Sequence, residues 1–359
     1  MHHDGPADKL EKLAVRLSAA SEEELLAILA QADADDEEMH TNPPQLGSAH
    51  PVAAGATEVT LLGALGHRYG MLAGGAGGLL VRTRQTCVLV DPGPAALGLL
   101  VRLTRQGRFD FGEVDAVLVS HFHPDHYTDV IPCLEGAVSA RGRRGRVMLA
   151  ANTTVIRRFG AFSPFHMRRV DPVALAHPDG AGEGEPMVKL ADLTIYATPA
   201  LHHEQDDEIR TAIGFAFDTP GGGIWYTGDT NLFGGLIDAV AALPPETDLV
   251  IAHVGGTNFQ ASPERAAVCR WHLQTRDIQA IAAALRPAGV IVQHYDAAYA
   301  TARYRVAQAL WLQRHLRAGG GKPTLVIPGR NGLHVTLHDQ QPLRRAVVLD
   351  DLPWPYPDL

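Results

Sequence analysis

The feature that most constrains the fold is a cluster of three histidines and one aspartate at the end of a short apolar segment. Residues 116–120 read Ala-Val-Leu-Val-Ser, and residues 121–126 read His-Phe-His-Pro-Asp-His. A short apolar run bounded by polar residues is typical of a buried β-strand. A solvated loop rarely places so many imidazole and carboxylate groups directly after such a strand. The cluster therefore predicts a metal site at the end of this strand, because these groups are good ligands for zinc, iron or manganese.

This cluster can supply ligands to two ions. In an extended segment, His121 and His123 point to the same side of the chain. A turn that begins at Pro124 can bring Asp125 and His126 round to a neighbouring point. One segment can therefore bind two neighbouring ions.

Three later apolar runs also end in a side chain that can bind a metal. The first is followed by His202 and His203, the second by Asp229, and the third by His294. Because α/β folds place their sites at the carboxyl ends of strands, we expect these side chains to meet the first cluster there.

Short apolar strands, glycine-rich turns and helical patterns alternate from about Ala54 onward. Strands are predicted at Glu58–Leu62, Gly78–Thr83, Thr86–Val90, Ala116–Ser120, Arg146–Ala150, Leu193–Thr198, Thr211–Phe217, Gly223–Thr227, Asp248–Ala252 and Val290–Gln293. Helices are predicted at Ala95–Gln106, Thr153–Phe159, Ser262–Leu285 and Thr301–Ala318. The pattern predicts an α/β domain over residues 54–340, with helices covering the sheets.

Residues 1–40 predict a helical hairpin with an acidic linker. Apolar residues recur at helical spacing from Leu10 to Leu17, and Ser21 with Glu24 predicts a capping box that opens a second helix. The acidic run Asp33–Glu38 predicts a flexible or extended connector. At the other end, the proline-rich residues 341–359 predict an extended tail.

Composition limits the class of protein. The net charge of −9 gives no general attraction to nucleic acid. Cys87, Cys133 and Cys269 are too few and too scattered for a disulfide framework, so a cytoplasmic protein is expected. The sequence shows neither a signal peptide at its start nor an apolar stretch long enough to span a membrane.

The order of these motifs resembles that of the metallo-β-lactamase-fold hydrolases. The resemblance covers roughly Ala54 to Leu337, and it implies a four-layer αββα sandwich. It also implies that Asp91, in the turn after an early strand, supports the site by contacting a metal ligand and not the metal itself. A turn aspartate that caps its own backbone is the alternative for this residue.

The resemblance also implies a set of ligands for two divalent ions. Zinc is the expected metal, and manganese and iron are the alternatives. One ion would be bound by His121, His123 and His202, the other by Asp125, His126 and His294, with Asp229 bridging the two. His202 is preferred over His203 because the sequence Pro-Ala-Leu-His, residues 199–202, matches a form found in lactonase-like and phospholipase-D-like members. The choice between the two remains open, and His203 is otherwise a substrate contact or a structural residue.

The expected chemistry is hydrolysis by a hydroxide that bridges the two ions. Asp125 would orient the hydroxide or act as a base. His253, at the end of another predicted strand, is the candidate general acid, and a structural histidine is the equal alternative.

The substrate is the least constrained prediction. A small phosphodiester such as a cyclic nucleotide or a phospholipid head group, or an RNA-type substrate, is favoured over a lactone, a thioester or another carboxylic ester. The hint is a run of arginines over residues 141–169, although a solvated basic surface is the more common explanation of such a run. A protein that binds metal without catalysis, and a homodimer formed through the hairpin, are further alternatives.

Overall fold

The structure is a computed structural model of the 359-residue chain. It describes residues 12–15, 17–41, 48–66, 71–72, 75–142, 145–177, 184–202, 211–244, 246–256, 271–296, 301–317, 324–338 and 346–348. The chain divides into two compact units, Met1–Gln45 and Leu46–Leu359.

The first unit contains helix α2, Glu22–Thr41, and a helical segment at residues 12–15. The predicted capping box is present. The Ser21 backbone N–H donates to the Glu24 carboxylate at 2.7 Å, and the Glu24 N–H donates to Ser21 Oγ at 3.2 Å. These two bonds satisfy amide groups that have no partner inside the helix. Packing of the two helical segments into a hairpin stays a prediction.

The predicted connector at Asp33–Glu38 is wrong, because α2 continues through it to Thr41. Neither glycine nor proline interrupts the sequence there before Pro43. A side-chain hydrogen bond of 2.7 Å from Gln31 to Asp35 joins successive turns of the helix.

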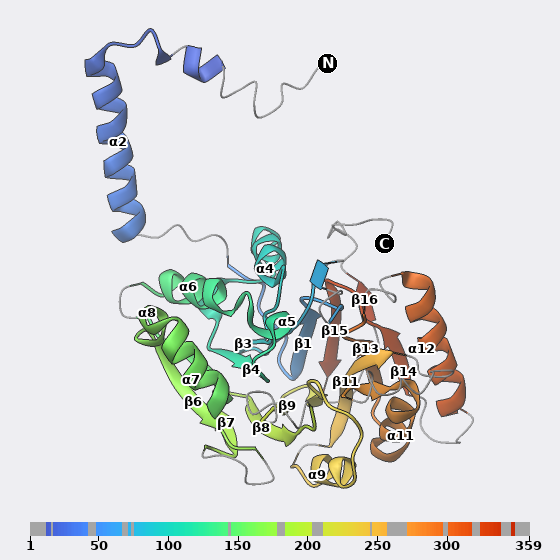
Figure 1. Cartoon of the computed structure of the whole chain (residues 1–359). Coiled ribbons are helices and arrows are strands. Elements are labelled where there is room, and N and C mark those ends of the chain that lie inside the picture. Colours follow the sequence, from blue (N-terminus) through green and yellow to red (C-terminus); the bar gives the residue numbers. More distant parts are fainter. Residues whose placement is uncertain are drawn as a thin grey trace. The chain divides into compact units, whose positions relative to one another are not determined.

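The second unit is built on two eight-stranded sheets (Figure 1). The first sheet has the order β16 (Ala346–Val348), β15 (Leu333–His338), β1 (Ala56–Leu61), β2 (Leu79–Arg82), β3 (Cys87–Val90), β4 (Ala116–Val119), β5 (Val147–Asn152) and β6 (Val170–Leu175). The second has the order β14 (Leu325–Pro328), β13 (Gly289–Gln293), β11 (Thr247–Gly256), β10 (Gly222–Tyr226), β9 (Ile213–Thr219), β8 (Thr194–Pro199) and β7 (Met187–Lys189), and β12 (Leu273–Gln274) pairs with β11.

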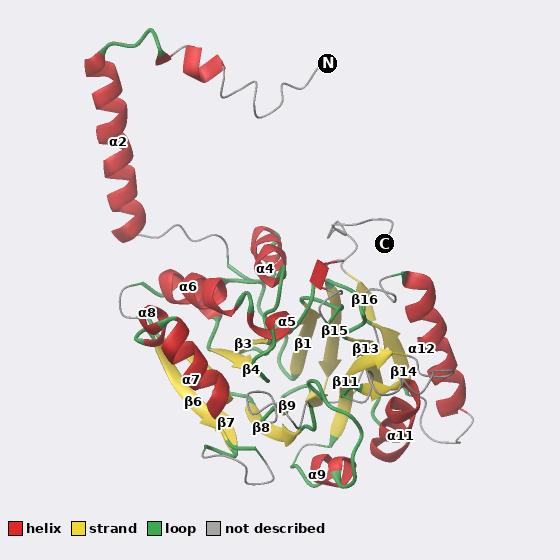
Figure 2. Ribbon diagram, viewed as in Figure 1, coloured by secondary structure: helices red, strands yellow, loops and turns green. Residues whose placement is uncertain are grey.

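Helices cover the outer face of each sheet (Figure 2). The first sheet packs on α4 (Ala96–Arg105), α6 (Val130–Ala140) and α7 (Thr153–Phe162), and the short α5 (Pro124–Tyr127) and α8 (Pro164–Met167) lie beside them. The second sheet packs on α9 (Leu236–Ala241), α11 (Thr275–Leu285) and α12 (Ala302–Arg317).

Alternation along the strands divides the apolar side chains among three cores. In β3, Val88 and Val90 face the second sheet, whereas Leu89 faces the helices. In β11, Ile251 faces the first sheet and Val250 faces the helices. Successive side chains of a strand point to opposite faces, so a strand between two layers must be apolar on both. These layers form the αββα sandwich that the resemblance to the metallo-β-lactamase-fold hydrolases implied.

The structure extends the predicted domain at both ends. Ala49 and Val52 are buried before residue 54, and β16 in the predicted tail pairs antiparallel with β15. The prolines at 353, 355 and 357 lie outside the described residues.

One predicted helix is partly wrong. Within Ser262–Leu285, residues 273 and 274 form β12, and α11 begins only at Thr275. A capping box explains this start, because Gln274 and Asp277 bond each other's backbone N–H groups. The predicted start of this helix at Ser262 lies outside the described residues.

Candidate metal centre

The predicted ligands meet where strands of the two sheets end. β4 ends one residue before Ser120, and the chain then passes through His121 in a short loop. His123 is still extended, with φ −101° and ψ 143°, and Pro124 opens α5 in its first turn. Proline suits this position because its fixed φ fits the first helical turn. The turn brings Asp125 and His126 to a different point from His121, as predicted.

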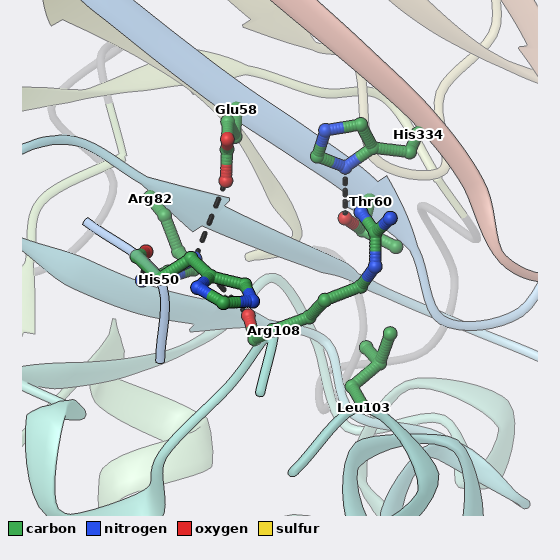
Figure 3. Close-up of a pocket in the computed structure, with 7 residues that line it drawn as sticks. All are labelled: His50, Glu58, Thr60, Arg82, Leu103, Arg108 and His334. Atoms are coloured by element: carbon green, nitrogen blue, oxygen red, sulfur yellow. Dashed lines mark hydrogen bonds and ion pairs between the residues drawn. The ribbon is translucent and has the colours of Figure 1, made fainter. Parts of the chain in front are cut away.

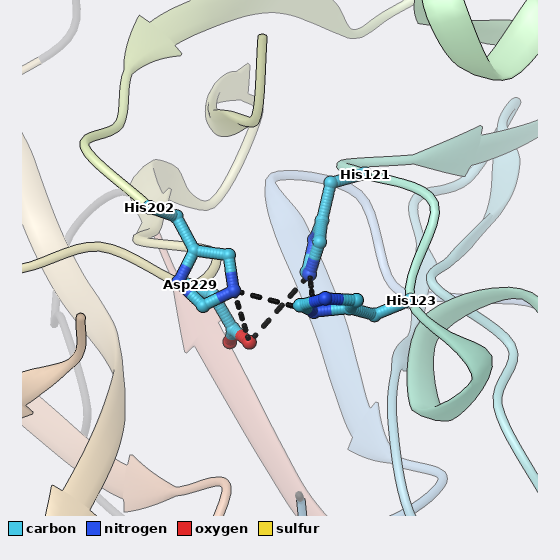
Figure 4. A group of neighbouring side chains, drawn as sticks. All are labelled: His121, His123, His202 and Asp229. Carbon is cyan, nitrogen blue, oxygen red and sulfur yellow. Dashed lines mark hydrogen bonds and ion pairs between the residues drawn. The ribbon is translucent and has the colours of Figure 1, made fainter. Parts of the chain in front are cut away.

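A first group consists of His121, His123, His202 and Asp229 (Figure 4). His123 Nδ1 lies 2.8 Å from His121 Nε2 and 3.2 Å from His202 Nε2. Asp229 Oδ2 lies 3.7 Å from His121 Nε2 and 3.8 Å from His202 Nε2.

A second group shares the same carboxylate and consists of His126, Asp229, His253 and His294, with Asp125 beside it. His126 Nε2 and His294 Nε2 are 3.3 Å apart, and each lies 3.3 Å from an oxygen of Asp229. Asp125 Oδ2 lies 3.1 Å from His294 Nε2 and 3.6 Å from His126 Nε2. Two ligands about 2.0–2.1 Å from one tetrahedral ion lie about 3.3 Å apart, so these spacings suit a metal ion.

The protonation of these groups also suits a cation. Burial holds the pKa of His121 and of His202 well below the ordinary value, so both imidazoles are neutral and offer lone pairs. Burial alone would raise the pKa of Asp229, but the surrounding imidazoles outweigh it and hold that pKa well below its usual range. The first group therefore combines two neutral nitrogen ligands with an ionised carboxylate, which suits a metal ion.

Asp91 supports the centre through His126. Its carboxylate accepts hydrogen bonds from the Ser120 N–H and Oγ, both at 2.6 Å, from the Tyr226 hydroxyl at 2.8 Å and from His126 Nδ1 at 2.9 Å. A histidine that binds a metal through one nitrogen is commonly oriented by a carboxylate at the other. The predicted contact of Asp91 with the centre is therefore present, and Tyr226 is a partner that the sequence did not reveal.

His253 is fully buried and touches the centre without facing open space. Its Nδ1 lies 2.8 Å from Asp229 Oδ1, and its Nε2 lies 2.8 Å from Gln293 Nε2. Burial lowers the pKa of His253 to about 4, against the opposing hydrogen bond to Asp229. Both ring nitrogens of His253 are therefore engaged, so this geometry offers no proton to a leaving group. His253 also lies within β11, whereas the sequence had placed it after the end of a strand.

Sequence reasoning missed His272. This buried residue lies before β12, with its Nε2 3.2 Å from Asp229 Oδ2. The centroid of its ring is 5.0 Å from that of His202 and 5.2 Å from that of His294, so it lies beside both groups. It escaped notice because residues 262–285 read as one helix. His203 lies outside the described residues.

In the arginine-rich region, Arg141 and Arg146 are paired with carboxylates. Arg141 bonds Asp115 at 3.0 Å, and Arg146 bonds Asp171 at 2.6 Å. These ion pairs account for the two arginines without a phosphate ligand.

A separate small cavity of about 50 Å³ lies beside β1, β2 and β15 (Figure 3). Buried Arg82 lines this cavity and donates hydrogen bonds to Glu58, to Glu113 and to the backbone carbonyls of His50 and Arg108. Since these partners occupy the guanidinium, we interpret Arg82 as a structural cross-link.

The region that contains the metal centre matches one known protein family. Residues 86–295, more than half of the chain, match the family described as the beta-lactamase superfamily domain. The chain belongs to this family.

Two curated relatives share part of the sequence. An uncharacterized protein of Methanocaldococcus jannaschii is 30% identical over 187 residues, which cover 50% of this chain and 64% of the relative. A metal-dependent hydrolase of Caldivirga maquilingensis is 23% identical over 215 residues, 58% of this chain and 74% of the relative. The chain thus spans less than two thirds of the first relative.

Solved structures agree on the fold. The metallo-beta-lactamase fold protein YhfI from Bacillus subtilis superposes with a TM-score of 0.58 at 17% identity, over 77% of this chain and 98% of that one. A diphosphatase of the PhnP family superposes with a TM-score of 0.54 at 16% identity, over 80% of this chain and 100% of that one. Among the described residues, the structure has no helix with the length and apolar character needed to cross a bilayer.

Proposed function

We propose that this protein is a dinuclear metallohydrolase that cleaves an anionic phosphodiester. The observation that carries the proposal is the position of Asp229, which belongs to both ligand groups. A carboxylate has two oxygens and can hold two cations at the separation of about 3.5–4 Å that two-metal hydrolysis uses. A pair of groups joined in this way fits the predicted dinuclear site.

The proposed ligands divide between two positions. His121, His123 and His202 would hold the first ion, and His126 and His294 with the adjacent Asp125 would hold the second, with Asp229 shared by both groups. When bound, two divalent ions, most simply zinc, lower the pKa of water toward neutrality and stabilise developing negative charge.

Asp125 is proposed to orient the attacking water molecule. The neighbouring imidazoles of His126 and His294 hold the pKa of its carboxyl well below the usual range, although burial alone would raise it. The carboxylate therefore stays ionised at the edge of the second group, where it can accept a hydrogen bond from the water molecule.

Two histidines contact Asp229 without belonging to the proposed ligand set, and they suit different tasks. Both nitrogens of His253 are engaged. His272 lies beside both ligand groups, next to the shared carboxylate. We therefore assign protonation of the leaving group to His272.

Charge favours an anionic substrate. Two divalent ions carry four positive charges, and the ligand set contributes two carboxylates, Asp125 and Asp229, so two positive charges remain. A phosphodiester balances part of that charge, whereas a lactone does not. The PhnP-family diphosphatase and a human tRNase Z, short form, which share the fold at TM-scores of 0.54 and 0.50, act on phosphorus esters or anhydrides by their names.

The proposal is tested by a panel of substrates with zinc-loaded and manganese-loaded protein. We expect turnover of bis-p-nitrophenyl phosphate or a cyclic nucleotide, and none of a lactone or a cephalosporin. His272→Gln should lower kcat by about 10²–10⁴-fold, the usual contribution of general acid catalysis.

A matched control is Asp192→Asn, because Asp192 accepts hydroxyl hydrogen bonds from Thr83 and Thr86 outside both ligand groups. It should keep full activity. Lactone turnover without phosphodiester turnover would contradict the proposed substrate. A fully active His272→Gln variant would contradict the assigned proton donor.

A further inference from the structure

A chain of hydrogen bonds leads from β13 to the shared carboxylate of Asp229. Gln293, the last residue of β13, lies directly before His294. Its side-chain nitrogen lies 2.8 Å from His253 Nε2, and His253 Nδ1 lies 2.8 Å from Asp229 Oδ1. All three side chains are almost completely buried.

The two ends of this chain determine which ring nitrogen of His253 carries the proton. An amide nitrogen can only donate, so His253 Nε2 must present a lone pair to Gln293. The carboxylate of Asp229 can only accept, so His253 Nδ1 must present an N–H. Both contacts are satisfied by one neutral tautomer, the one protonated at Nδ1.

That tautomer decides between two roles for His253. His253 lies close enough to His126, His294 and Asp229 to complete a four-membered ligand group, and Nδ1 is the nitrogen that faces Asp229. A ligand would need its lone pair at Nδ1 and its proton at Nε2, where it would face the N–H of Gln293. The amide of Gln293 therefore opposes the ligand role.

Packing keeps the ring from turning to exchange its nitrogens. The His253 ring stacks on His294, with a centroid distance of 4.9 Å and an interplanar angle of 9°. The ring of Tyr226 packs edge-on at 4.5 Å. The backbone N–H of His253 also donates to Thr227 Oγ1 at 3.1 Å, which anchors the residue.

We propose that Gln293 holds His253 in the Nδ1–H tautomer, which makes His253 a positioning residue for Asp229 and excludes it from the ligands. The proposal rests on the proposed function in taking Asp229 as the shared ligand. A hydrogen bond to Oδ1 fixes the rotation of the carboxylate, so that Oδ2 lies 3.3 Å from His126 and 3.7 Å from His121, between the groups. Gln293 thereby acts on the metal centre through two intermediates.

The direct test is nuclear magnetic resonance of the full chain with ¹⁵N-labelled histidine, in metal-free and zinc-loaded forms. The signals of His253 are identified by their loss in His253→Asn. We expect Nδ1 to show the shift of a protonated ring nitrogen and Nε2 that of a nitrogen with a lone pair, in both forms. A zinc-shifted or unprotonated Nδ1 in the loaded protein would overturn the proposal.

Metal affinity gives a second readout. The variant His253→Asn keeps an N–H donor near the position of Nδ1, so it should bind the second zinc nearly as tightly as the wild-type protein. The variant His253→Leu has no such donor. Both His253→Leu and Gln293→Met should weaken binding of the second zinc by about 10–100-fold, the usual effect of losing a hydrogen-bond partner of a metal ligand. Equal weakening in His253→Asn and His253→Leu would indicate a lost ligand and contradict the proposal.

Gln308→Met is the matched control for Gln293→Met. Gln308 is also buried, and its side chain donates to Thr275 Oγ1 at 2.9 Å, between α12 and α11. It should leave zinc affinity and the signals of His253 unchanged. A protein that shows the expected signals but hydrolyses no phosphodiester would contradict the proposed function alone.

Discussion

Replacing Asp91 by asparagine should weaken the second metal position without unfolding the protein. Asp91 has φ 45°, in the left-handed region, where asparagine is one of the best tolerated residues. The backbone therefore accepts the change, and only the charge and one acceptor oxygen are lost. The new NH₂ group would face donors, because Ser120, Tyr226 and His126 all donate to the present carboxylate.

The expected magnitude follows from these contacts. Losing the carboxylate behind a histidine ligand typically weakens metal binding by about 10–100-fold, which is about 1.4–2.8 kcal/mol. Tyr226→Phe removes only one of the four hydrogen bonds to Asp91, so it should have the smaller effect of the two.

Zinc affinity is measured by competition with a chromophoric chelator, and thermal unfolding checks that both variants are folded. The first position should lose less affinity than the second, because Asp91 contacts His126 directly but reaches His121 through Ser120 Oγ, which lies 3.0 Å from His121 Nδ1. An Asp91→Asn variant that binds both ions as tightly as the unchanged protein would refute this account of Asp91.

Three further predictions follow from other parts of the structure. Arg82→Met should lower the free energy of unfolding by about 1–3 kcal/mol in urea titrations, because two partly buried hydrogen bonds to backbone carbonyls are lost, and it should leave metal content unchanged. Gly93→Ala should loosen the second ion in the chelator assay, because a Cβ there meets the backbone oxygen of Asp125, which would have to move. On acidification the second ion should leave first. Burial holds the pKa of His202 well below its ordinary value, so protons compete for it only at low pH. Burial alone would also lower the pKa of His126, but nearby carboxylates raise it well above that value, so protons compete already at higher pH. Metal content after dialysis at stepwise lower pH checks the order, and simultaneous loss of both ions would contradict it.

The sequence predicted the fold and the meeting of the ligands because both depend on local patterns. Each ligand stands directly after an apolar strand, and strand ends on one edge of a sheet converge by topology alone. The cluster at residues 121–126 even shows its division into two groups, since proline at 124 must turn the chain.

The remaining features depend on contacts between distant segments, which no local pattern contains. Tyr226 reaches Asp91 from the other sheet, and His272 reaches Asp229 across 43 positions of sequence. The contact of His253 with Gln293 was not predicted for the same reason, because the two residues lie 40 positions apart in the sequence. The connector at Asp33–Glu38 was mispredicted because negative charge was given more weight than helix propensity.

Anomalous diffraction at the zinc edge, from crystals of the zinc-loaded protein, tests the central claim most directly. The account predicts two peaks, about 3.5–4 Å apart, on either side of the Asp229 carboxylate. One peak should have His121, His123 and His202 as its neighbours, and the other Asp125, His126 and His294. A single peak, or a second peak bound by His253 in place of Asp125, would contradict it.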